Sequence, residues 1–193
     1  MNSLADGDGF IFMKIGTHAG EGLEDIIARK LGEVDRAGFA MWGYGGNTCH
    51  PVTKVRPFAE DLAGAGQTIR LLMEPMVSKH YAPPVPADEF SVDGENWSPI
   101  DLSVHRVLGS RYALFIRDIR QEAMDLPLEN TVVGIGQQEG RPGHRYVQGR
   151  VDKACLRFRQ EGERSNAPDP STTHAIGLVA ELVPPYAALL RNR

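Results

Sequence analysis

Residues 10–43, with the sequence FIFMKIGTHAGEGLEDIIARKLGEVDRAGFAMWG, decide the fold because they read as a strand, a helix and a second strand. Residues 10–15 are apolar on both alternating faces apart from Lys14, which predicts a strand covered on both sides, near the middle of a sheet. Residues 22–37 form the clearest helix, and residues 39–43 the second strand. The helix carries its apolar side chains on one stripe: Leu23, Ile26, Ile27, Leu31 and Val34.

Lys30 breaks that helical pattern. It lies four residues from both Ile26 and Val34, so it projects from the middle of the apolar stripe. Two interpretations follow. Either its methylene stem passes the core and its ammonium group reaches water, or the ammonium group enters a polar pocket.

Working outward, Pro57 suits the first position of a short second helix that ends at the glycines 64–66, and residues 67–73 read as a third strand. The part from about 8 to 75 is therefore β-α-β-α-β. The part from about 85 to 183 is rich in strands. There the pattern predicts a hairpin turn at 93–96, a strand passing into a helix within 144–159, a last strand at 173–182 and a short helix at 186–190.

These elements predict one α+β domain over residues 1–193. We expect a curved or partly closed mixed β-sheet with one long amphipathic helix packed on it. A doubly wound parallel sheet is less favoured, because helices do not alternate with strands beyond residue 75.

Composition narrows the function classes. The chain has 193 residues, 41% of them hydrophobic and 24% charged, and a formal net charge of −4, which gives no overall electrostatic footprint for nucleic acid. Two cysteines give no disulfide framework, and the polar N-terminal residues lack the apolar core of a secretory signal. No apolar run approaches the ~20 residues that span a bilayer. We therefore expect a cytoplasmic protein that is not held in a membrane.

Residues 38–51, GFAMWGYGGNTCHP, concentrate the most chemistry, because an aromatic strand leads into a glycine-rich turn that ends in a thiol and an imidazole. If the first two strands are parallel neighbours, their exit loops share one edge of the sheet. Ligand sites in α/β units favour that edge. Lys14 would lie close behind that edge. The residues brought together would be Thr17, His18, Asn47, Thr48, Cys49 and His50.

Trp42 and Tyr44 lie on one face of the second predicted strand. They are either core side chains or a wall on which a planar ligand stacks. The glycines Gly16, Gly20 and Gly22 fit neither the dinucleotide fingerprint nor the Walker loop, so we interpret them as a structural turn.

Three functional hypotheses follow. The first is a cytoplasmic binding protein for a small polar, possibly nucleotide-like ligand, with Lys14, Asn47 and His50 as polar contacts. The second is a hydrolase or transferase with His18 or His50 as general base and Cys49 as nucleophile. The third is a protein- or nucleic-acid-interaction module acting through the basic region 141–159.

The sequence identifies no cofactor and no oligomeric state. Zinc has ligands of the right types in four side chains, but their spacing matches no standard pattern. Those four side chains are Cys49, His50, His18 and His80.

Overall fold

The computed structural model describes residues 7–44, 50, 52–80, 85–148 and 151–193. The main elements follow along the chain as β1 (Gly9–His18), α1 (Leu23–Ala37), β2 (Ala40–Gly43), α2 (Val52–Gly64), β3 (Arg70–His80), β4 (Glu89–Ser91), β5 (Ser98–Pro99), β6 (Tyr112–Pro127), β7 (Thr131–Val133), α3 (Gly143–Tyr146), β8 (Lys153–Phe158) and β9 (Thr173–Arg191). Three short 3-10 turns complete the chain: η1 (Leu128–Asn130), η2 (Glu161–Glu163) and η3 (Pro170–Thr172).

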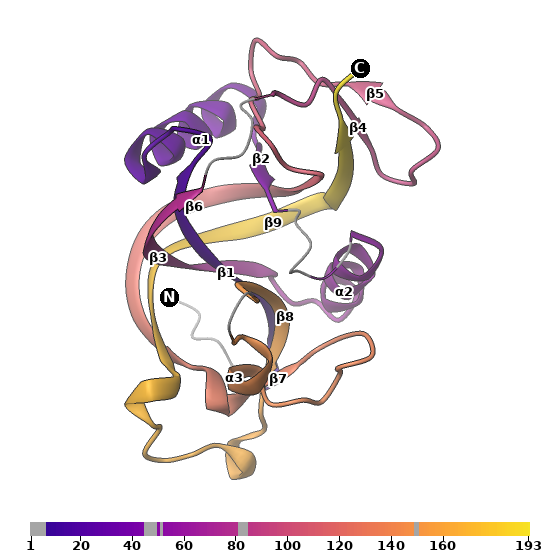
Figure 1. The fold of residues 1–193 in the computed structure, drawn as a ribbon. Helices are drawn as coiled ribbons and strands as arrows, with labels where there is room; N and C mark the ends of the chain where they lie inside the picture. Colours follow the sequence, from indigo (N-terminus) through magenta and orange to yellow (C-terminus); the bar gives the residue numbers. More distant parts are fainter. Residues whose placement is uncertain (1–6, 45–49, 51, 81–84, 149–150) are drawn as a thin grey trace.

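The described strands form one nine-stranded mixed sheet, whose main path runs β2-β6-β9-β3-β1-β8-β7. Figure 1 shows β6 and β9 side by side as long curved ribbons, with α2 inside their curve and α1 toward one end. Among the described residues the two edge strands, β2 and β7, do not pair with each other. The predicted mixed, curved sheet is confirmed, and it is not closed. Two helices of 15 and 13 residues, α1 and α2, share the packing.

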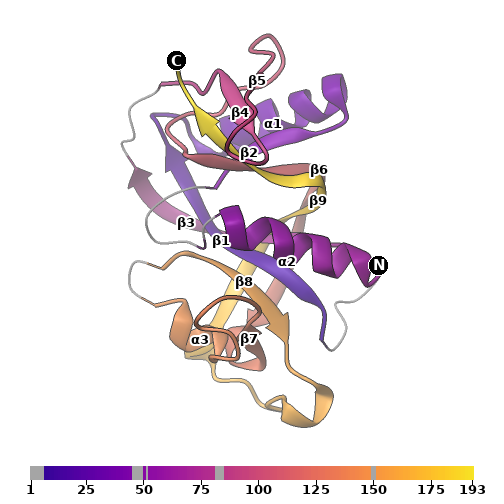
Figure 2. The same ribbon diagram turned by 90° about the vertical axis from the view of Figure 1, so that its right-hand side faces the viewer.

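Hydrophobic residues cover both faces of the sheet, and the alternation of each strand divides them. On β1, Ile11 and Met13 belong to the main core, which also includes apolar residues of α1 and α2, whereas Phe10 and Phe12 belong to a second core on the opposite face. A third core lies beneath β4 and the segment after it. Figure 2 shows β8, β7 and α3 below α2, at the other end of the molecule from β4 and β5. β1 pairs with β3 on one side and β8 on the other, as a strand buried on both faces requires.

Two of the predicted helices are wrong. The structure reverses the predicted order within 144–159, because the short helix α3 comes first and β8 follows it, paired antiparallel with β1. Residues 186–190 continue β9 instead of forming a helix. In both segments the apolar residues fit helical and strand periods, and pairing with a neighbouring strand decided between them.

The predicted position of Pro57 is also wrong. Pro57 lies inside α2, which begins five residues earlier at Val52. Proline removes one backbone hydrogen bond in a helix interior. The loss is compatible with α2 because its other side, with Val55, Phe58 and Leu62, is buried in the main core.

The first two predicted strands are not neighbours. Three strands, β3, β9 and β6, separate β1 from β2, and every pairing on the path from β2 to β3 is antiparallel. The condition for a shared exit edge therefore does not hold. Local patterns predicted each strand correctly, but the order of strands in the sheet depends on contacts between distant parts of the chain.

An ionic network joins α1 to the rest of the molecule. The fully buried Glu33 carboxylate accepts hydrogen bonds from Lys30 Nζ at 2.8 and 3.0 Å and from the backbone N–H groups of Met41 at 3.2 Å and Arg106 at 3.1 Å. His105 Nδ1 lies 3.3 Å from it. Lys30 also donates to the carbonyl oxygen of Met41 at 2.5 Å and to that of Arg106 at 2.9 Å. Of the two interpretations of Lys30, the polar pocket is correct.

Burial and pairing act against each other in this network. Burial lowers the pKa of Lys30 to about 8, against the opposing attraction of Glu33. For Glu33, burial alone would raise the pKa, but hydrogen bonds from His105 and Lys30, with the charge of Lys30, lower it below its ordinary value. Both side chains are therefore charged at neutral pH, as a buried ion pair whose remaining atoms have hydrogen-bond partners.

Glu33→Gln should lower the free energy of unfolding by about 3–5 kcal/mol, because it leaves the buried Lys30 charge without its counterion. Lys30→Met should cost less, since Glu33 keeps Arg29, His105 and two backbone donors. Urea unfolding monitored by circular dichroism measures both values. Glu60→Gln, in the exposed pair with Arg56, is the matched control and should change the value by less than about 0.5 kcal/mol. A loss for Glu33→Gln no larger than that of the control would contradict the assigned role.

Candidate functional site

Trp42 and Tyr44 are core side chains. Their exposed fractions are 4% and 1%, and both belong to the main core. The antiparallel pairing of β2 with β6 holds them there, and the Tyr44 backbone N–H continues that pairing by donating to the carbonyl oxygen of Tyr112 at 3.0 Å. The Tyr44 and Tyr112 rings pack with their centroids 5.7 Å apart.

His50 extends this aromatic packing toward α3. The Tyr112 hydroxyl donates to the His50 carbonyl oxygen at 2.5 Å, and the His50 imidazole stacks on the Tyr146 ring at 5.2 Å with an interplanar angle of 14°. We call the four residues Tyr44, Tyr112, His50 and Tyr146 the His50 cluster. It joins the end of β2, the start of β6, the beginning of α2 and the end of α3.

His50 Nε2 is the unusual atom of this cluster. The side chain is 94% buried (6% exposed), and Nε2 has no hydrogen-bond partner among the described residues. Burial lowers the pKa of the imidazole below its ordinary value, so the ring is neutral at pH 7. A neutral imidazole offers one donor and one acceptor nitrogen. The arrangement therefore holds a buried polar atom, stacked on Tyr146, without a hydrogen-bond partner among the described residues.

The structure places three other predicted residues on β1. Lys14 alternates with Met13 on β1 and lies on the face of Phe12, opposite the face of Trp42. Thr17 is near the end of β1, opposite Lys79 of β3. His18 Nε2 lies 2.7 Å from the carbonyl oxygen of Leu108, which only accepts, so this nitrogen is the donor.

Three predicted residues, Asn47, Thr48 and Cys49, lie outside the described part of the chain. In the described ranges, no group of three histidine, cysteine, aspartate or glutamate side chains lies close enough to hold a metal ion. The second cysteine, Cys155, is fully buried in the main core.

The described cations of the basic region 141–159 have several different neighbours. Arg141 contacts the carbonyl oxygen of Arg145, and Arg157 lies over the Phe58 ring at 5.1 Å. Arg159 donates to the carbonyl oxygen of Glu129 at 3.1 Å, and Lys153 pairs with Asp152 at 3.0 Å. Each of these described cations therefore has a contact within the fold.

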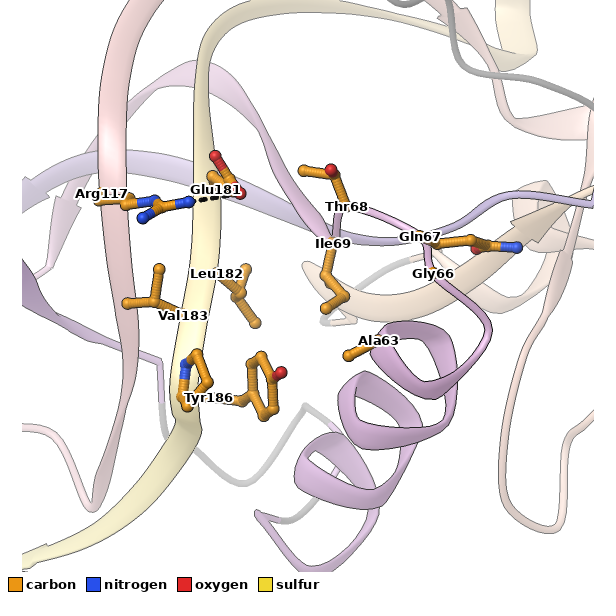
Figure 3. Close-up of a pocket in the computed structure, with 11 residues that line it drawn as sticks. Ala63, Gly66, Gln67, Thr68, Ile69, Arg117, Glu181, Leu182, Val183 and Tyr186 are labelled. Atoms are coloured by element: carbon orange, nitrogen blue, oxygen red, sulfur yellow. Dashed lines mark hydrogen bonds and ion pairs between the residues drawn. The ribbon is translucent and has the colours of Figure 1, made fainter.

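Sequence reasoning missed Tyr112 and Tyr146, and it missed a pocket on another part of the sheet. A pocket of about 400 Å³ lies where the C-terminal end of α2 and the segment 66–69 meet β9 (Figure 3). We call it the β9 pocket. A sequence signal for it existed in Pro184 and Pro185, because prolines inside a strand mark a bulge.

A scan against protein-family models, a search of curated proteins and a search of solved structures each found no match to the chain. Of the described helices, none combines the length and apolar character needed to cross a bilayer. Function is therefore argued from the geometry of the sites.

The pKa of His50 predicts a pH dependence of stability. Because burial lowers this pKa, the unfolded chain takes up a proton near pH 6.5 and the folded chain takes it up only at lower pH. The free energy of unfolding should thus be fully retained above pH 6.5 and should fall as pH drops through the folded-state pKa, by at most ~1.4 kcal/mol per pH unit.

His50→Gln should remove this slope between pH 7.5 and 5, measured by urea unfolding at each pH. Carboxylates with lowered pKa, such as Glu33, titrate below this window. An unchanged slope in the variant would show that His50 is not the titrating group.

Proposed function

We propose that the protein is a cytoplasmic binding protein for a small polar, nucleotide-like ligand, and that the His50 cluster is its binding site. The observation that carries this proposal is the buried Nε2 of His50, which has no hydrogen-bond partner in the described part of the chain. Leaving such a group unpaired costs about 1–3 kcal/mol, and folded proteins contain few of them. A ligand that pairs with Nε2 recovers this cost on binding.

The neighbouring rings support a planar ligand. Tyr146 lies nearly parallel to the imidazole at 5.2 Å, and Tyr112 holds the His50 backbone in place through its hydroxyl. Aromatic walls with a small number of fixed polar atoms are typical of small-molecule sites. Because the imidazole is neutral at pH 7, it recognises a hydrogen-bonding atom of the ligand and adds no attraction for a phosphate.

Of the polar residues expected from the sequence, His50 alone is in the described part of this site. Lys14 lies on β1, which is not adjacent to β2 in the sheet, and Asn47 and Thr48 lie outside the described residues. The proposal therefore rests on His50 and the three tyrosines. Its cytoplasmic location is a prediction from the low cysteine content of the sequence.

His50→Phe tests the proposal through two readouts that move in opposite directions. The variant keeps a ring against Tyr146 but removes the unpaired nitrogen, so the free energy of unfolding should stay the same or rise by about 1 kcal/mol. Binding should be lost. Isothermal titration with the four common ribonucleosides and their 5′-monophosphates measures it, and we expect at least one to bind the unmodified protein.

His174→Phe is the matched control, because His174 is a half-buried histidine paired with Glu74 at 2.8 Å elsewhere in the structure. It should leave the affinity for the bound nucleoside or nucleotide unchanged. The proposal fails if none of the eight compounds binds, or if His50→Phe binds as well as the unmodified protein. A large loss of stability in His50→Phe would show instead that Nε2 has a structural partner.

The same imidazole favours a second candidate function. A neutral histidine whose Nε2 has no partner among the described residues has the protonation state that a general base requires. His50 is then the base of a hydrolase or transferase. His18 is less suited, because its Nε2 already donates to Leu108.

Labelling kinetics separate the enzyme from the binding protein. If Cys49 is the nucleophile, iodoacetamide should alkylate it at pH 7 at least tenfold faster than it alkylates free cysteine, because a paired base increases the thiolate fraction. His50→Gln should remove the acceleration. Labelling at or below the rate of free cysteine would contradict the enzyme hypothesis and leave the binding function as proposed. Peptide mass spectrometry distinguishes Cys49 from the buried Cys155.

A further inference from the structure

The β9 pocket forms where the pairing of β6 with β9 is interrupted. Leu114 pairs with Ala187 and Ile116 pairs with Leu182, so one residue of β6 lies opposite the four residues 183–186 of β9. Proline has no backbone N–H, so Pro184 and Pro185 cannot continue the hydrogen-bonded ladder. The bulge that results leaves room between β9 and the end of α2.

Backbone strain accompanies this bulge. Tyr186 has φ = +66°, and Asp118, at a second irregularity of β6 beside the pocket residue Arg117, has φ = +49°. Non-glycine residues in this region are strained and concentrate at ligand-binding positions. Here the strained Tyr186 places its ring against the pocket (Figure 3).

The pocket combines apolar surface with one charged pair. Ile69 and Leu182, each 3% exposed, and Ala63 face it together with Tyr186. At its side Arg117 Nη2 donates to Glu181 Oε1 at 3.1 Å. In the described part of the chain, Arg117 Nη1 and Glu181 Oε2 make no other hydrogen bond. Both side chains are partly exposed, so the pair leaves a donor and an acceptor atom that a ligand is able to reach.

We propose that the β9 pocket binds a neutral, flat molecule with a cyclic amide edge, as in a pyridone or a pyrimidine base. The ring N–H of the amide donates to Glu181 Oε2, and its carbonyl oxygen accepts from Arg117 Nη1. The ring itself lies against Tyr186 and the apolar side chains. The pocket volume of about 400 Å³ is in the range of small-molecule sites.

Charge selects a neutral ligand over an anion. Arg117 is half-exposed and already paired with Glu181, and the Asp118 carboxylate lies 3.6 Å from its Nε. Two carboxylates thus surround one guanidinium group. A ligand carboxylate gains little net attraction there, whereas a neutral amide satisfies both free atoms.

Protein-observed NMR with 2-pyridone tests this inference directly. Saturable shifts should appear at the backbone amides of Thr68, Ile69, Glu181 and Tyr186. N-methyl-2-pyridone lacks the N–H donor and should bind at least tenfold more weakly. Benzoate and benzylammonium should bind more weakly than 2-pyridone. No shift with 2-pyridone at millimolar concentration, equal binding of the N-methyl compound, or a preference for either ion would overturn the proposal.

Two variants locate the interaction. Glu181→Leu should weaken 2-pyridone binding at least tenfold. Glu122→Leu is the control, because Glu122 pairs with Arg120 on the same strand and has the same 24% side-chain exposure as Glu181. It should leave binding unchanged.

Tyr186→Gly should also weaken binding, and it should lower the free energy of unfolding, because the Tyr186 ring packs against the main core and its loss outweighs the relief of the positive φ. If Tyr186→Gly binds 2-pyridone normally, the ring is not part of the site. His50→Phe should have no effect on this binding, so the result is independent of the function proposed for the His50 cluster.

Discussion

The rest of the structure depends on the hydrogen bonds and the ion pair of the Glu33 carboxylate. This carboxylate is fully buried and meets Lys30 and Arg29 of its own helix, the backbone of Met41 in β2, and His105 and Arg106 of a distant segment. A buried carboxylate is tolerated only when such partners are complete. One side chain therefore fixes three segments relative to one another. Apolar contacts alone would define the relative positions of these segments less precisely.

This network sets the position of the His50 cluster. Met41 is the second residue of β2, so the bonds that hold its backbone also fix the strand that carries Trp42 and leads to Tyr44. Tyr44 packs on Tyr112, and Tyr112 holds His50. The Glu33 and Lys30 network thus supports the short edge strand β2, and β2 supports the position of the His50 imidazole. The Nε2 atom of that imidazole has no hydrogen-bond partner among the described residues. Rigid support of this kind is what a preorganised binding atom requires.

The sequence was sufficient wherever the deciding contacts are local. The helix α1, the buried strand β1 and the turn at 93–96 follow from the spacing of neighbouring residues and were predicted. Lys30 was recognised as anomalous, but its partners Met41 and Arg106 were not visible, because one of them lies 76 residues away. Strand order was likewise beyond local patterns. It placed three strands between β1 and β2, so these strands are not the parallel neighbours on which the expected site depended.

Tyr112 was missed for the same reason, since 62 residues separate it from His50. The β9 pocket was missed for a different one. Residues 186–190 were interpreted as a helix after two prolines, although prolines within an apolar run also indicate a strand with a bulge. The apolar residues of that short segment fit the helical period about as well as the strand period. Pairing with the long strand β6 decided that it is a strand.

Both proposed sites lie where regular strand pairing stops, and there is a physical reason for this. Within a continuous ladder the backbone groups are paired and the side chains pack at alternating positions, so no polar atom is left for a ligand. Just before α2, outside the strands, His50 Nε2 has no hydrogen-bond partner among the described residues. At the bulge of β9 it appears as the positive φ of Tyr186 and an open volume beside Arg117 and Glu181. Each carries a free-energy cost that packing elsewhere offsets, and ligand binding recovers part of that cost only at the first site, where the penalty is a missing hydrogen bond.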